Sequence, residues 1–291
     1  MMQTAELSDA LTAIRIVLVA PAGPLNVGSV ARVMKNFGLS QLVLVSPQCE
    51  VLGEQALQMA VHADDILRAA KQVETIPEAL AGCEFAIATT ARSRGFNAPL
   101  YPPETVLPRL ITTSAAQTAL IFGPEDRGLS NTELTYAQAY TKIPTSDAYS
   151  ALNLAQAVAV CCYELSRTKV RPTSEISPEI TEIAKGQNQR LPGDKSDSIQ
   201  TDSPLQNDPP SAKQTKSNRL SKATLDELEG YYQHLESVLL KVEYLYPHTA
   251  QSRMRKVRQL LHRTTPTSNE VALLRGMLRQ VEWALSDSNK G

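Results

Sequence analysis

Residues 14–38, IRIVLVAPAGPLNVGSVARVMKNFG, decide the fold class because two periodicities follow each other within them. The first half is a continuous run of β-branched and apolar residues, which is typical of a strand buried on both faces. In the second half, apolar residues recur at helical spacing from Val30 to Phe37, and Gly38 follows as a residue suited to end a helix. A buried strand followed directly by an amphipathic helix is the repeating unit of a parallel sheet.

The same alternation continues along the chain. Three further apolar runs, QLVLVSP, CEFAIATT and TALIFGPE, begin at residues 41, 83 and 118 and are predicted strands. An Ala-rich helical pattern covers residues 151–169 and carries Arg and Lys at its end, where they suit the negative pole of the helix dipole. We therefore expect an α/β fold with a mostly parallel sheet and helices on both faces.

Composition divides the chain into three parts. Residues 171–219 are dominated by Pro, Ser, Asp, Gln, Lys and Asn, and they cannot bury enough apolar surface to offset the entropy of ordering. They are predicted to be a flexible linker between a domain at 1–170 and a helical extension at 220–291. In the extension, capping-box signals at Thr224 and Thr267 each open a pattern of apolar residues three and four apart, so two helices are expected to pack together.

The segment between these two helices is strongly basic. Residues 251–263, QSRMRKVRQLLHR, hold five Arg or Lys and no acidic residue. A helical wheel gives a narrow apolar stripe of Met254, Val257 and Leu261. The residues that face away from this stripe are Arg255, Arg258 and His262. Such a face is either a solvated surface or a phosphate-binding surface, and the segment itself leaves both interpretations open.

The overall composition excludes several classes of protein. The formal net charge is −1 and the pI is about 6.5, so any nucleic-acid contact must come from local patches. Four cysteines lack CxxC spacing and are expected to be small buried hydrophobes in a reducing compartment. Because no secretory signal and no apolar run of about 20 residues is present, a soluble, cytoplasmic protein without a membrane anchor is expected. HExxH, Cys/His clusters and GxSxG are absent, so no metal site and no serine hydrolase are expected.

In open parallel sheets, ligands bind in the loops beyond the carboxyl ends of the strands. The first such loop, PAGPLNVGSVAR at 21–32, lacks both GxGxxG and GxxxxGK(S/T), which disfavours a dinucleotide site and a P-loop. It places Asn26 and Ser29 near a helix N-terminus, with Arg32 one turn beyond Ser29, and this arrangement suits an anionic phosphate. The alternative is that Asn26 is only an N-cap and Arg32 a surface residue.

Two later loops have a similar character. Residues 122–134, FGPEDRGLSNTEL, combine Gly123 and Gly128 in a tight turn with a capping box, and such a loop can wrap a small ligand. Residues 143–155, IPTSDAYSALNLA, place polar side chains at the start of the long helix. An ordinary capped helix explains this third loop when it is taken alone. Three such loops in one chain favour a ligand site.

Four segments in this order resemble the SPOUT superfamily, most closely the TrmJ branch of tRNA 2′-O-methyltransferases. They are residues 14–38, TTARSR at 89–94, LIFGPEDRGLSNTEL at 120–134 and IPTSDAYSALNLAQAVAV at 143–160. The resemblance covers residues 14–168. The helical tail at 220–291 resembles the C-terminal extension of the same branch, which binds tRNA.

The resemblance implies S-adenosylmethionine as the methyl donor, a homodimer, and tRNA as the substrate. The expected product carries a methyl group on the ribose 2′-oxygen of a cytidine or uridine in the anticodon loop, at the nucleotide conventionally numbered thirty-two. A trefoil knot in the C-terminal part of the catalytic domain is also implied. Periodicity alone does not predict a knot, since knots are essentially absent among folds.

The resemblance also assigns roles to individual residues. Arg32 matches the arginine that lies next to the target ribose, and Asn26 matches the asparagine beside it, so both are assigned to the catalytic site. The cofactor-lining positions are matched by Thr89, Thr90, Ala91, Gly123, Ile143, Ser150, Ala151 and Leu152. The expected RNA contacts are Ser29, Arg92, Arg94, Arg253, Arg255, Lys256 and Arg258. Ala151 departs from the family pattern, because a serine is usual at this position and any role of its hydroxyl is lost.

Methyl transfer requires that the 2′-oxygen is aligned with the methyl group and loses its proton. A guanidinium stays protonated in proteins, so Arg32 is expected to stabilise the developing alkoxide, and whether it is itself the base stays open. One alternative is a methyltransferase of this fold that acts on ribosomal or another RNA. The other is a catalytically silent RNA-binding protein of the same fold, which the Ala151 departure favours weakly. A nucleotide-dependent oxidoreductase is disfavoured by the missing dinucleotide fingerprint.

Overall fold

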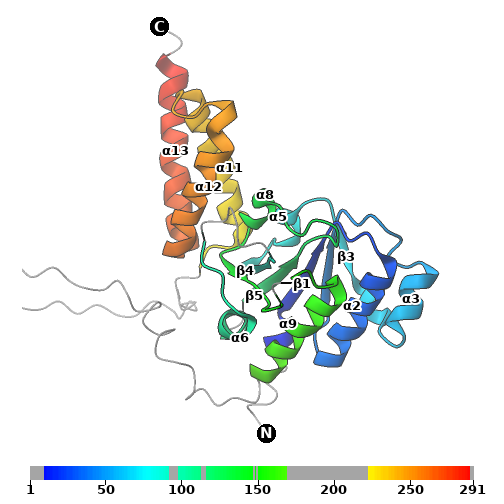
Figure 1. Cartoon of the computed structure of the whole chain (residues 1–291). Coiled ribbons are helices and arrows are strands. Elements are labelled where there is room, and N and C mark those ends of the chain that lie inside the picture. The colour runs from blue at the N-terminus through cyan, green and yellow to red at the C-terminus, as the bar shows by residue number, and fades with distance from the viewer. Residues whose placement is uncertain are drawn as a thin grey trace, which may run out of the picture. The chain divides into compact units, whose positions relative to one another are not determined.

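The computed structural model describes residues 10–91, 98–112, 116–146, 148, 150–168 and 222–288, and its ribbon is drawn in Figure 1. Arg92, Arg94 and the predicted linker at 171–219 lie outside the described residues. The described residues before 170 and those after 220 belong to one compact unit.

A parallel sheet forms the centre of this unit. Its strands are β1 (Ile14–Val19), β2 (Gln41–Val45), β3 (Lys71–Val73), β4 (Cys83–Thr89), β5 (Gln117–Phe122) and β6 (Ala139–Thr141). They are ordered β3-β2-β1-β5-β4-β6, and every neighbouring pair is parallel. The four long apolar runs of the sequence are therefore strands, as predicted. The sequence does not predict the edge strands β3 and β6, because three residues are too few for a periodic signal.

Alternation along β1 divides the core into two layers. Ile14, Ile16 and Leu18 belong to an apolar cluster on one face of the sheet, and Val17 and Val19 belong to a second cluster on the other face. All five side chains are at most 4% exposed. Burial on both faces explains why the strand is a continuous apolar run rather than an alternation of polar and apolar residues.

The first face is covered by helices that follow the strands in sequence. They are α2 (Pro24–Phe37), α3 (Glu54–Ala60), α4 (Asp64–Ala69), α6 (Pro103–Val106), α7 (Pro108–Thr112) and α9 (Leu154–Thr168). Helix α2 packs against both α3 and α9. Gly28 permits the close approach to α3, because a Cβ at this position would lie 2.1 Å from the carbonyl oxygen of Ala56.

The ends of α2 follow from two glycines and a proline. Pro24 occupies the first turn, where its missing N–H costs nothing, and Gly23 is the N-cap residue. At the other end, Gly38 has a φ of 78°, the left-handed conformation expected of a glycine that ends a helix. The alternative prediction that Asn26 is the N-cap is wrong, because the helix already begins at Pro24.

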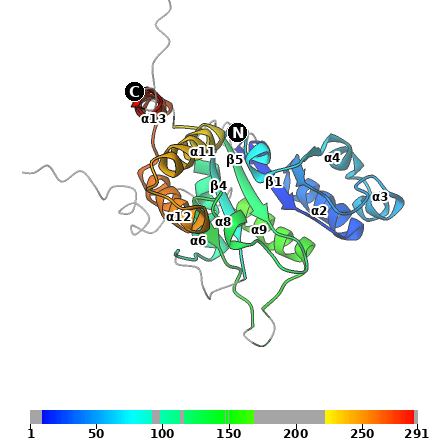
Figure 2. The ribbon, with the colours of Figure 1, turned by 90° about the horizontal axis from the view of Figure 1, so that it is seen from above.

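The second face is covered by α5 (Ile76–Ala79), α8 (Asn131–Leu134) and helices from the C-terminal end of the chain. Those helices are α11 (Leu225–Lys241), α12 (Pro247–Thr264) and α13 (Ser268–Ser288). Figure 2 shows α11 and α12 on one side of the sheet and α2 and α3 on the other. Helix α11 packs on β4 and α5, and α13 packs along α11, as the matching apolar patterns predict.

Both predicted capping boxes are present in these helices, at Thr224–Glu227 and at Thr267–Glu270. The fold class, a parallel sheet with helices on both faces and a helical C-terminal region, is confirmed. The helical extension and the sheet contribute to the same apolar cluster. The predicted domain boundaries at 170 and 219 and the trefoil knot stay predictions.

Three of the four cysteines, Cys83, Cys161 and Cys162, are buried as predicted, and Cys49 is half-buried. Burial raises the pKa of the Cys83 thiol to about 11 and that of Cys162 to about 12, so both stay protonated. Within the described part of the chain, no helix is long and apolar enough to cross a membrane. In the same residues, no group of three His, Cys, Asp or Glu could hold a metal ion.

Candidate functional site

A cavity opens at the edge of the sheet where the parallel strands end. It encloses about 370 Å³ and is formed by the segments that follow β4, β5 and β6. The carboxyl edge of an open parallel sheet is where such folds bind ligands, because the loops there are free of the sheet's own hydrogen bonding. The volume lies within the range of small-molecule sites, roughly 300 to 1,000 Å³.

All eight residues assigned to cofactor binding line this cavity. They come from three separate segments, which are Thr89, Thr90 and Ala91 at the end of β4, Gly123 after β5, and Ile143, Ser150, Ala151 and Leu152 between β6 and α9. The fold therefore brings together residues that lie far apart in the sequence. Their role in binding stays a prediction.

The loop after β5 is folded tightly around two glycines. A Cβ on Gly123 would lie 2.3 Å from the backbone nitrogen of Leu129, so no larger residue fits without moving the loop. Gly128 has a φ of 65°, a conformation that favours glycine. The Ser130–Glu133 capping box then opens α8, as predicted. The backbone of this loop is thereby fixed as one wall of the cavity.

A hydrogen-bond network joins three loops beside the cavity. The Asn26 side chain donates through Nδ2 to Glu125 Oε1 at 2.8 Å and accepts through Oδ1 from Asn153 Nδ2 at 2.9 Å. Glu125 also accepts from the backbone N–H groups of Ala22 and Gly23, both at 3.1 Å. Asn153 Oδ1 accepts from two backbone N–H groups at the start of α9. The network fixes the β1–α2 loop against the β5 loop and the start of α9.

Glu125 is the residue of this site that sequence reasoning misses. Burial raises the pKa of its carboxyl group, but hydrogen bonds from Ala22, Asn26 and Gly23 lower it more, so the pKa lies below its ordinary value. The group is therefore ionised at neutral pH and uses its oxygens as acceptors within the protein. These contacts suit it to position Asn26. An acidic residue three positions after the end of a buried strand, inside a glycine-containing loop, is the signal that could have identified Glu125.

An ion pair holds the other end of the cavity loop. Arg127 donates to both carboxylate oxygens of Glu133, at 2.7 and 2.9 Å, and to the carbonyl oxygen of Gly128 at 3.0 Å. The hydrogen bond from Arg127 lowers the pKa of Glu133 to about 2, against the raising effect of burial. Because Arg127 and Gly128 line the cavity and Glu133 belongs to α8, this pair ties the cavity loop to that helix.

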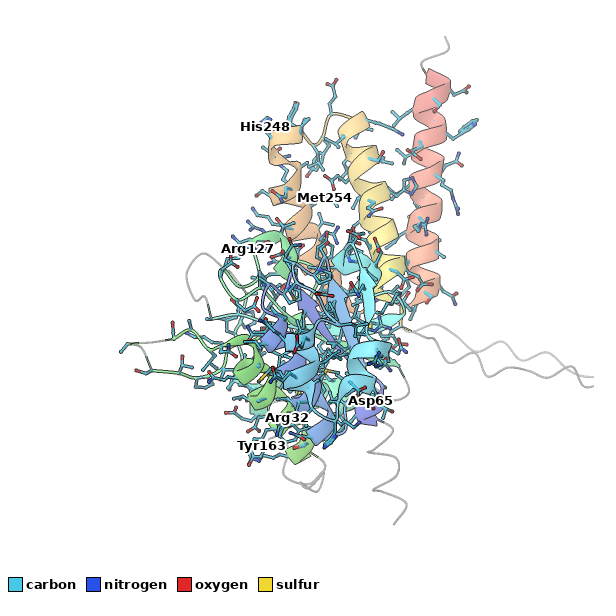
Figure 3. The ribbon with its side chains drawn as sticks, turned by 90° about the vertical axis from the view of Figure 1, so that its right-hand side faces the viewer. Arg32, Asp65, Arg127, Tyr163, His248 and Met254 are labelled. Carbon is cyan, nitrogen blue, oxygen red and sulfur yellow. The ribbon has the colours of Figure 1, made fainter. Side chains whose placement is uncertain are left out.

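Arg32 lies outside the cavity lining. It is exposed on α2, and among the described residues it has no hydrogen-bond or ion-pair partner. In Figure 3, Arg32 lies away from Arg127 and on the same flank of the molecule as Tyr163 of α9. Ser29, one turn before Arg32, donates to the carbonyl oxygen of Leu25 at 2.7 Å within its own helix. Within one chain, the structure thus joins Asn26 to the cavity loop and leaves Arg32 apart from it.

Helix α12 carries the other predicted RNA contacts. Arg253 and Lys256 are exposed, and Arg255 is partly exposed. Arg253 donates to the carbonyl oxygen of Tyr244 at 3.0 Å, and its guanidinium lies 5.7 Å from the centre of the Tyr244 ring. These three residues remain available on the outer surface of the helix, as the wheel predicts for Arg255.

The orientation predicted for Arg258 and His262 is wrong. Arg258 forms an ion pair with Glu229 of α11, in which the two side chains are only 12% and 11% exposed. Its guanidinium also lies 4.4 Å from the centre of the Tyr232 ring. His262 faces inward as well, where burial lowers its pKa to about 4. Helix α12 contacts two neighbours at once, α11 and the segment around α8, so residues outside the single apolar stripe are also covered.

Comparisons with family models match both parts of the chain. The model of the SpoU rRNA Methylase family matches residues 13–163, which is more than half of the 291 residues. The model described as tRNA methyltransferase TrmJ, C-terminal domain, matches residues 226–290. The first match contains the sheet and the cavity, and the second contains nearly all of the three C-terminal helices.

Whole-chain comparisons agree with the family models. A tRNA (cytidine/uridine-2′-O-)-methyltransferase TrmJ from Cronobacter sakazakii is 36% identical over 270 residues, covering 92% of this chain and 96% of the relative. A tRNA (cytidine/uridine/adenosine-2′-O-)-methyltransferase TrmJ from Pseudomonas aeruginosa is 35% identical over 274 residues, covering 94% and 95%. The crystal structure of TrmJ from Z. mobilis superposes with a TM-score of 0.70 at 29% identity, covering 92% of this chain and 98% of that one. The chain therefore belongs to the SpoU methylase family of methyltransferases, within its TrmJ branch.

Proposed function

We propose that this protein transfers a methyl group from S-adenosylmethionine to a ribose 2′-oxygen of tRNA. The observation that carries the proposal is the cavity, because all eight residues assigned to the cofactor line it at the carboxyl edge of the sheet. The names of the relatives that match over nearly the whole chain, tRNA 2′-O-methyltransferases, support the same reaction.

The cavity fits S-adenosylmethionine in size and in chemistry. Its volume of about 370 Å³ suits a ligand of this size. Leu129, Ile143 and Leu152 supply apolar side chains suited to an adenine ring, and Asp126 supplies a carboxylate suited to the positively charged amino group. The tight turn at Gly123 lets the backbone approach a ligand closely. When bound, the cofactor supplies an electrophilic methyl group.

The transfer requires alignment of the 2′-oxygen and stabilisation of negative charge as its proton leaves. Asn26 is held on both sides by Glu125 and Asn153, so we assign it to brace the site rather than to take the proton. Arg32 keeps its guanidinium donors unused among the described residues, so it can bind the ribose oxygen or a neighbouring phosphate. Because a guanidinium stays protonated, Arg32 stabilises the developing alkoxide, and the proton leaves to phosphate or water.

In this proposal the protein is a homodimer, and Arg32 acts at the cavity of the partner subunit. Arg32 is not part of its own cavity lining. The flank of α2 and α9 that carries it exposes apolar side chains, with Leu25 at 49%, Val160 at 36% and Tyr163 at 51%. Apolar residues gathered beside a free charged group are typical of a protein interface.

Mixed dimers test the action of Arg32 across the interface. Chains with Arg32→Ala and chains with Gly123→Val are each expected to be inactive. A heterodimer of the two regains one working site if Arg32 serves the partner, because the Arg32→Ala subunit keeps an intact cavity. It stays inactive if Arg32 serves its own cavity. Sedimentation supplies the check on assembly, since Tyr163→Glu should give monomers, whereas Tyr244→Glu, exposed on the α11–α12 connection, should not.

The RNA contacts proposed from the resemblance are carried forward with one omission. They are Ser29, Arg92, Arg94, Arg253, Arg255 and Lys256. Arg258 is left out, because its donors are used by Glu229. Reversing the three charges on α12 should reduce the slope of log affinity for tRNA against log salt by about two to three, since each phosphate contact contributes about 0.7 to 0.9. An unchanged slope would place the phosphate contacts elsewhere.

The decisive experiment incubates the full chain with isotope-labelled S-adenosylmethionine and unmodified tRNA transcripts, followed by nucleoside mapping. We expect the product to be a 2′-O-methylated cytidine or uridine in the anticodon loop, at the nucleotide numbered thirty-two. Adenosine is worth including among the target bases, because the Pseudomonas aeruginosa relative is named for three bases. Absence of label in tRNA, with an intact and folded chain, would remove the proposal.

Ribosomal RNA is the second candidate substrate, because the family model that matches residues 13–163 is described as an rRNA methylase. Offering ribosomal RNA fragments and tRNA in the same assay separates the two. Binding of the cofactor without transfer to either RNA would instead identify a catalytically silent RNA-binding protein.

A further inference from the structure

Helix α12 contacts the segment that carries the cavity loop, although α12 contributes none of the residues that line the cavity. Gln251 Nε2 donates to Thr132 Oγ1 of α8 at 2.7 Å, a hydrogen bond between residues 119 positions apart. The guanidinium of Arg258 lies 5.5 Å from the centre of the Tyr136 ring, two residues after the end of α8. Two points on the same short segment are thus held from one face of α12 (Figure 2).

Arg258 is itself fixed in place, so its contact with Tyr136 is a rigid one. Both of its terminal nitrogens donate to the two carboxylate oxygens of Glu229 on α11. Tyr232 of the same helix lies against the guanidinium. A bidentate, largely buried arginine stacked on two rings has little rotational freedom. Helix α12 therefore presents a firm surface to the segment around α8.

Helix α8 in turn is coupled to the cavity wall. Glu133 of α8 accepts from the Ser130 backbone N–H at 2.6 Å and pairs with Arg127, which lines the cavity. Arg127 also donates to the carbonyl oxygen of Gly128, in the same loop. If α8 shifts, the cavity loop must shift with it, because a helix of four residues is too short to bend and leave the loop in place.

We propose that Gln251 and Arg258 are positioning residues for the cavity loop, so that the C-terminal helices set the affinity of the cavity for its nucleoside cofactor. The inference rests on the proposed function. In this inference α12 has two roles. Its inner side contacts α8 and positions that helix, and its outer side exposes Arg253 and Lys256. Neither Gln251 nor Arg258 touches the cavity itself.

Titration calorimetry of the full chain with S-adenosylhomocysteine, the demethylated and unreactive form of the cofactor, tests this. Gln251→Ala removes one neutral hydrogen bond, so the dissociation constant is expected to rise about 3- to 10-fold. Thr132→Val removes the same bond from the other side and should give the same change. The double variant should bind S-adenosylhomocysteine no more weakly than either single variant, because all three variants lose the same hydrogen bond.

Gln259→Ala is the matched control. Gln259 lies on the same helix and makes no hydrogen bond in the described part of the chain, so its removal should leave the dissociation constant unchanged. Steady-state kinetics give an independent readout, with a raised KM for the cofactor and an unchanged kcat at saturating cofactor in Gln251→Ala. A merely structural role of Gln251 would lower the melting temperature without this split.

Unchanged cofactor affinity in both Gln251→Ala and Thr132→Val overturns the inference while leaving the proposed function intact. Additive losses in the double variant overturn it as well, because they would show that the two residues act separately. If the wild-type chain binds no S-adenosylhomocysteine at all, the proposed function fails first, and the inference falls with it.

Discussion

Helices α2 and α12 each carry an arginine that the sequence marks as functional, and their surroundings differ in every respect. Arg32 on α2 is exposed and has no partner among the described residues. Arg258 on α12 is 12% exposed at its side chain, pairs with Glu229 and lies over the Tyr232 ring. Both residues belong to helices with an apolar and a polar face, and the sequence of each helix leaves its arginine outside the apolar stripe. The difference therefore comes from what other segments bring to each helix.

This comparison separates two uses of a guanidinium. An arginine whose donors are satisfied inside the protein stabilises the fold and offers nothing to a ligand, whereas an arginine left open in the free chain costs little and can bind an incoming anion. On this basis, removing Arg32 should lower turnover and spare the fold. Removing Arg258 should lower the stability of the fold and, through the cavity loop, the affinity for the cofactor, without lowering turnover at saturating cofactor. Each of the following experiments tests one side of that contrast.

The largest effect is expected for Arg32→Ala. Turnover should fall by about 100- to 1,000-fold, in line with the loss of one hydrogen-bond donor at a developing oxyanion. Binding of S-adenosylhomocysteine and the urea midpoint should not change, because the side chain loses no contact with any residue that the structure describes. Arg68→Ala, an exposed arginine on α4, serves as the control and should stay active. Full activity of Arg32→Ala would remove Arg32 from the chemistry and erase the contrast.

The next largest effect is expected for Arg258→Ala, measured as the free energy of unfolding in urea. Removal of one member of a buried ion pair leaves Glu229 buried and unpaired, which costs about 3 to 5 kcal/mol. Arg255→Ala on the same helix should cost less than about 0.5 kcal/mol. Arg258→Met combined with Glu229→Leu should recover most of the stability, because no uncompensated charge remains. Equal, small losses in Arg258→Ala and Arg255→Ala would contradict the structural role of Arg258.

A smaller effect is expected for Glu125→Gln, which sharpens the picture at α2. The amide group keeps the size of the carboxylate but turns one acceptor into a donor that faces donors already present, Asn26 Nδ2 and two backbone N–H groups. The expected cost is about 1 to 3 kcal/mol of stability, with turnover lowered by about 10-fold as Asn26 loses its brace. Glu104→Gln on the exposed side of α6 should have neither effect. Wild-type turnover in Glu125→Gln would show that the network is dispensable.

The smallest effect concerns acid stability and His262. The pKa of His262 is lowered from 6.5 to about 4, chiefly by burial. Between these values the unfolded chain binds a proton that the folded chain does not, so stability should fall as the pH drops from 6.5 towards 4. The slope from this residue is at most about 1.4 kcal/mol per pH unit. Urea titrations across this pH range should show a smaller loss of unfolding free energy in His262→Gln, whereas His248→Gln should lose as much as the wild type. If the free energy of unfolding depends on pH in the same way in all three chains, the His262 imidazole is not buried in solution.

Local patterns predicted the elements whose signals are complete within a short stretch. The strand that begins at Ile14, the helix that ends at Gly38 and the capping box at Thr224 all depend on neighbours within one or two turns. The alternative that Asn26 is the N-cap of α2 is wrong, although Pro24 is a local signal for the first helical turn. The edge strands β3 and β6 are not predicted from the sequence, because they are strands through their pairing with β2 and β4 and not through a pattern of their own.

The candidate site was predictable to a smaller extent. Glycines and caps in three loops indicate a ligand but do not say which one, so the cofactor positions were named only through the resemblance. Glu125 was missed because its importance depends on Asn26, 99 positions earlier in the chain. Arg258 was misjudged because a helical wheel contains one helix only, whereas its partner Glu229 lies on another helix 29 positions away. The pattern of residues within one helix cannot reveal that a charged side chain forms an ion pair with a residue on another helix.

The shared apolar cluster on the second face of the sheet has a consequence for how the protein is made. Val17, Val43 and Ile121 on the strands are covered together with Leu228 and Tyr232 of α11. During translation, the last strand ends at Thr141, and α11 begins only at Leu225. While the ribosome adds the intervening residues, α5 and α8 alone cover this face, and the apolar surface that α11 later covers stays exposed on the nascent chain. Exposed apolar surface of this kind is what chaperones bind and what promotes aggregation of truncated chains.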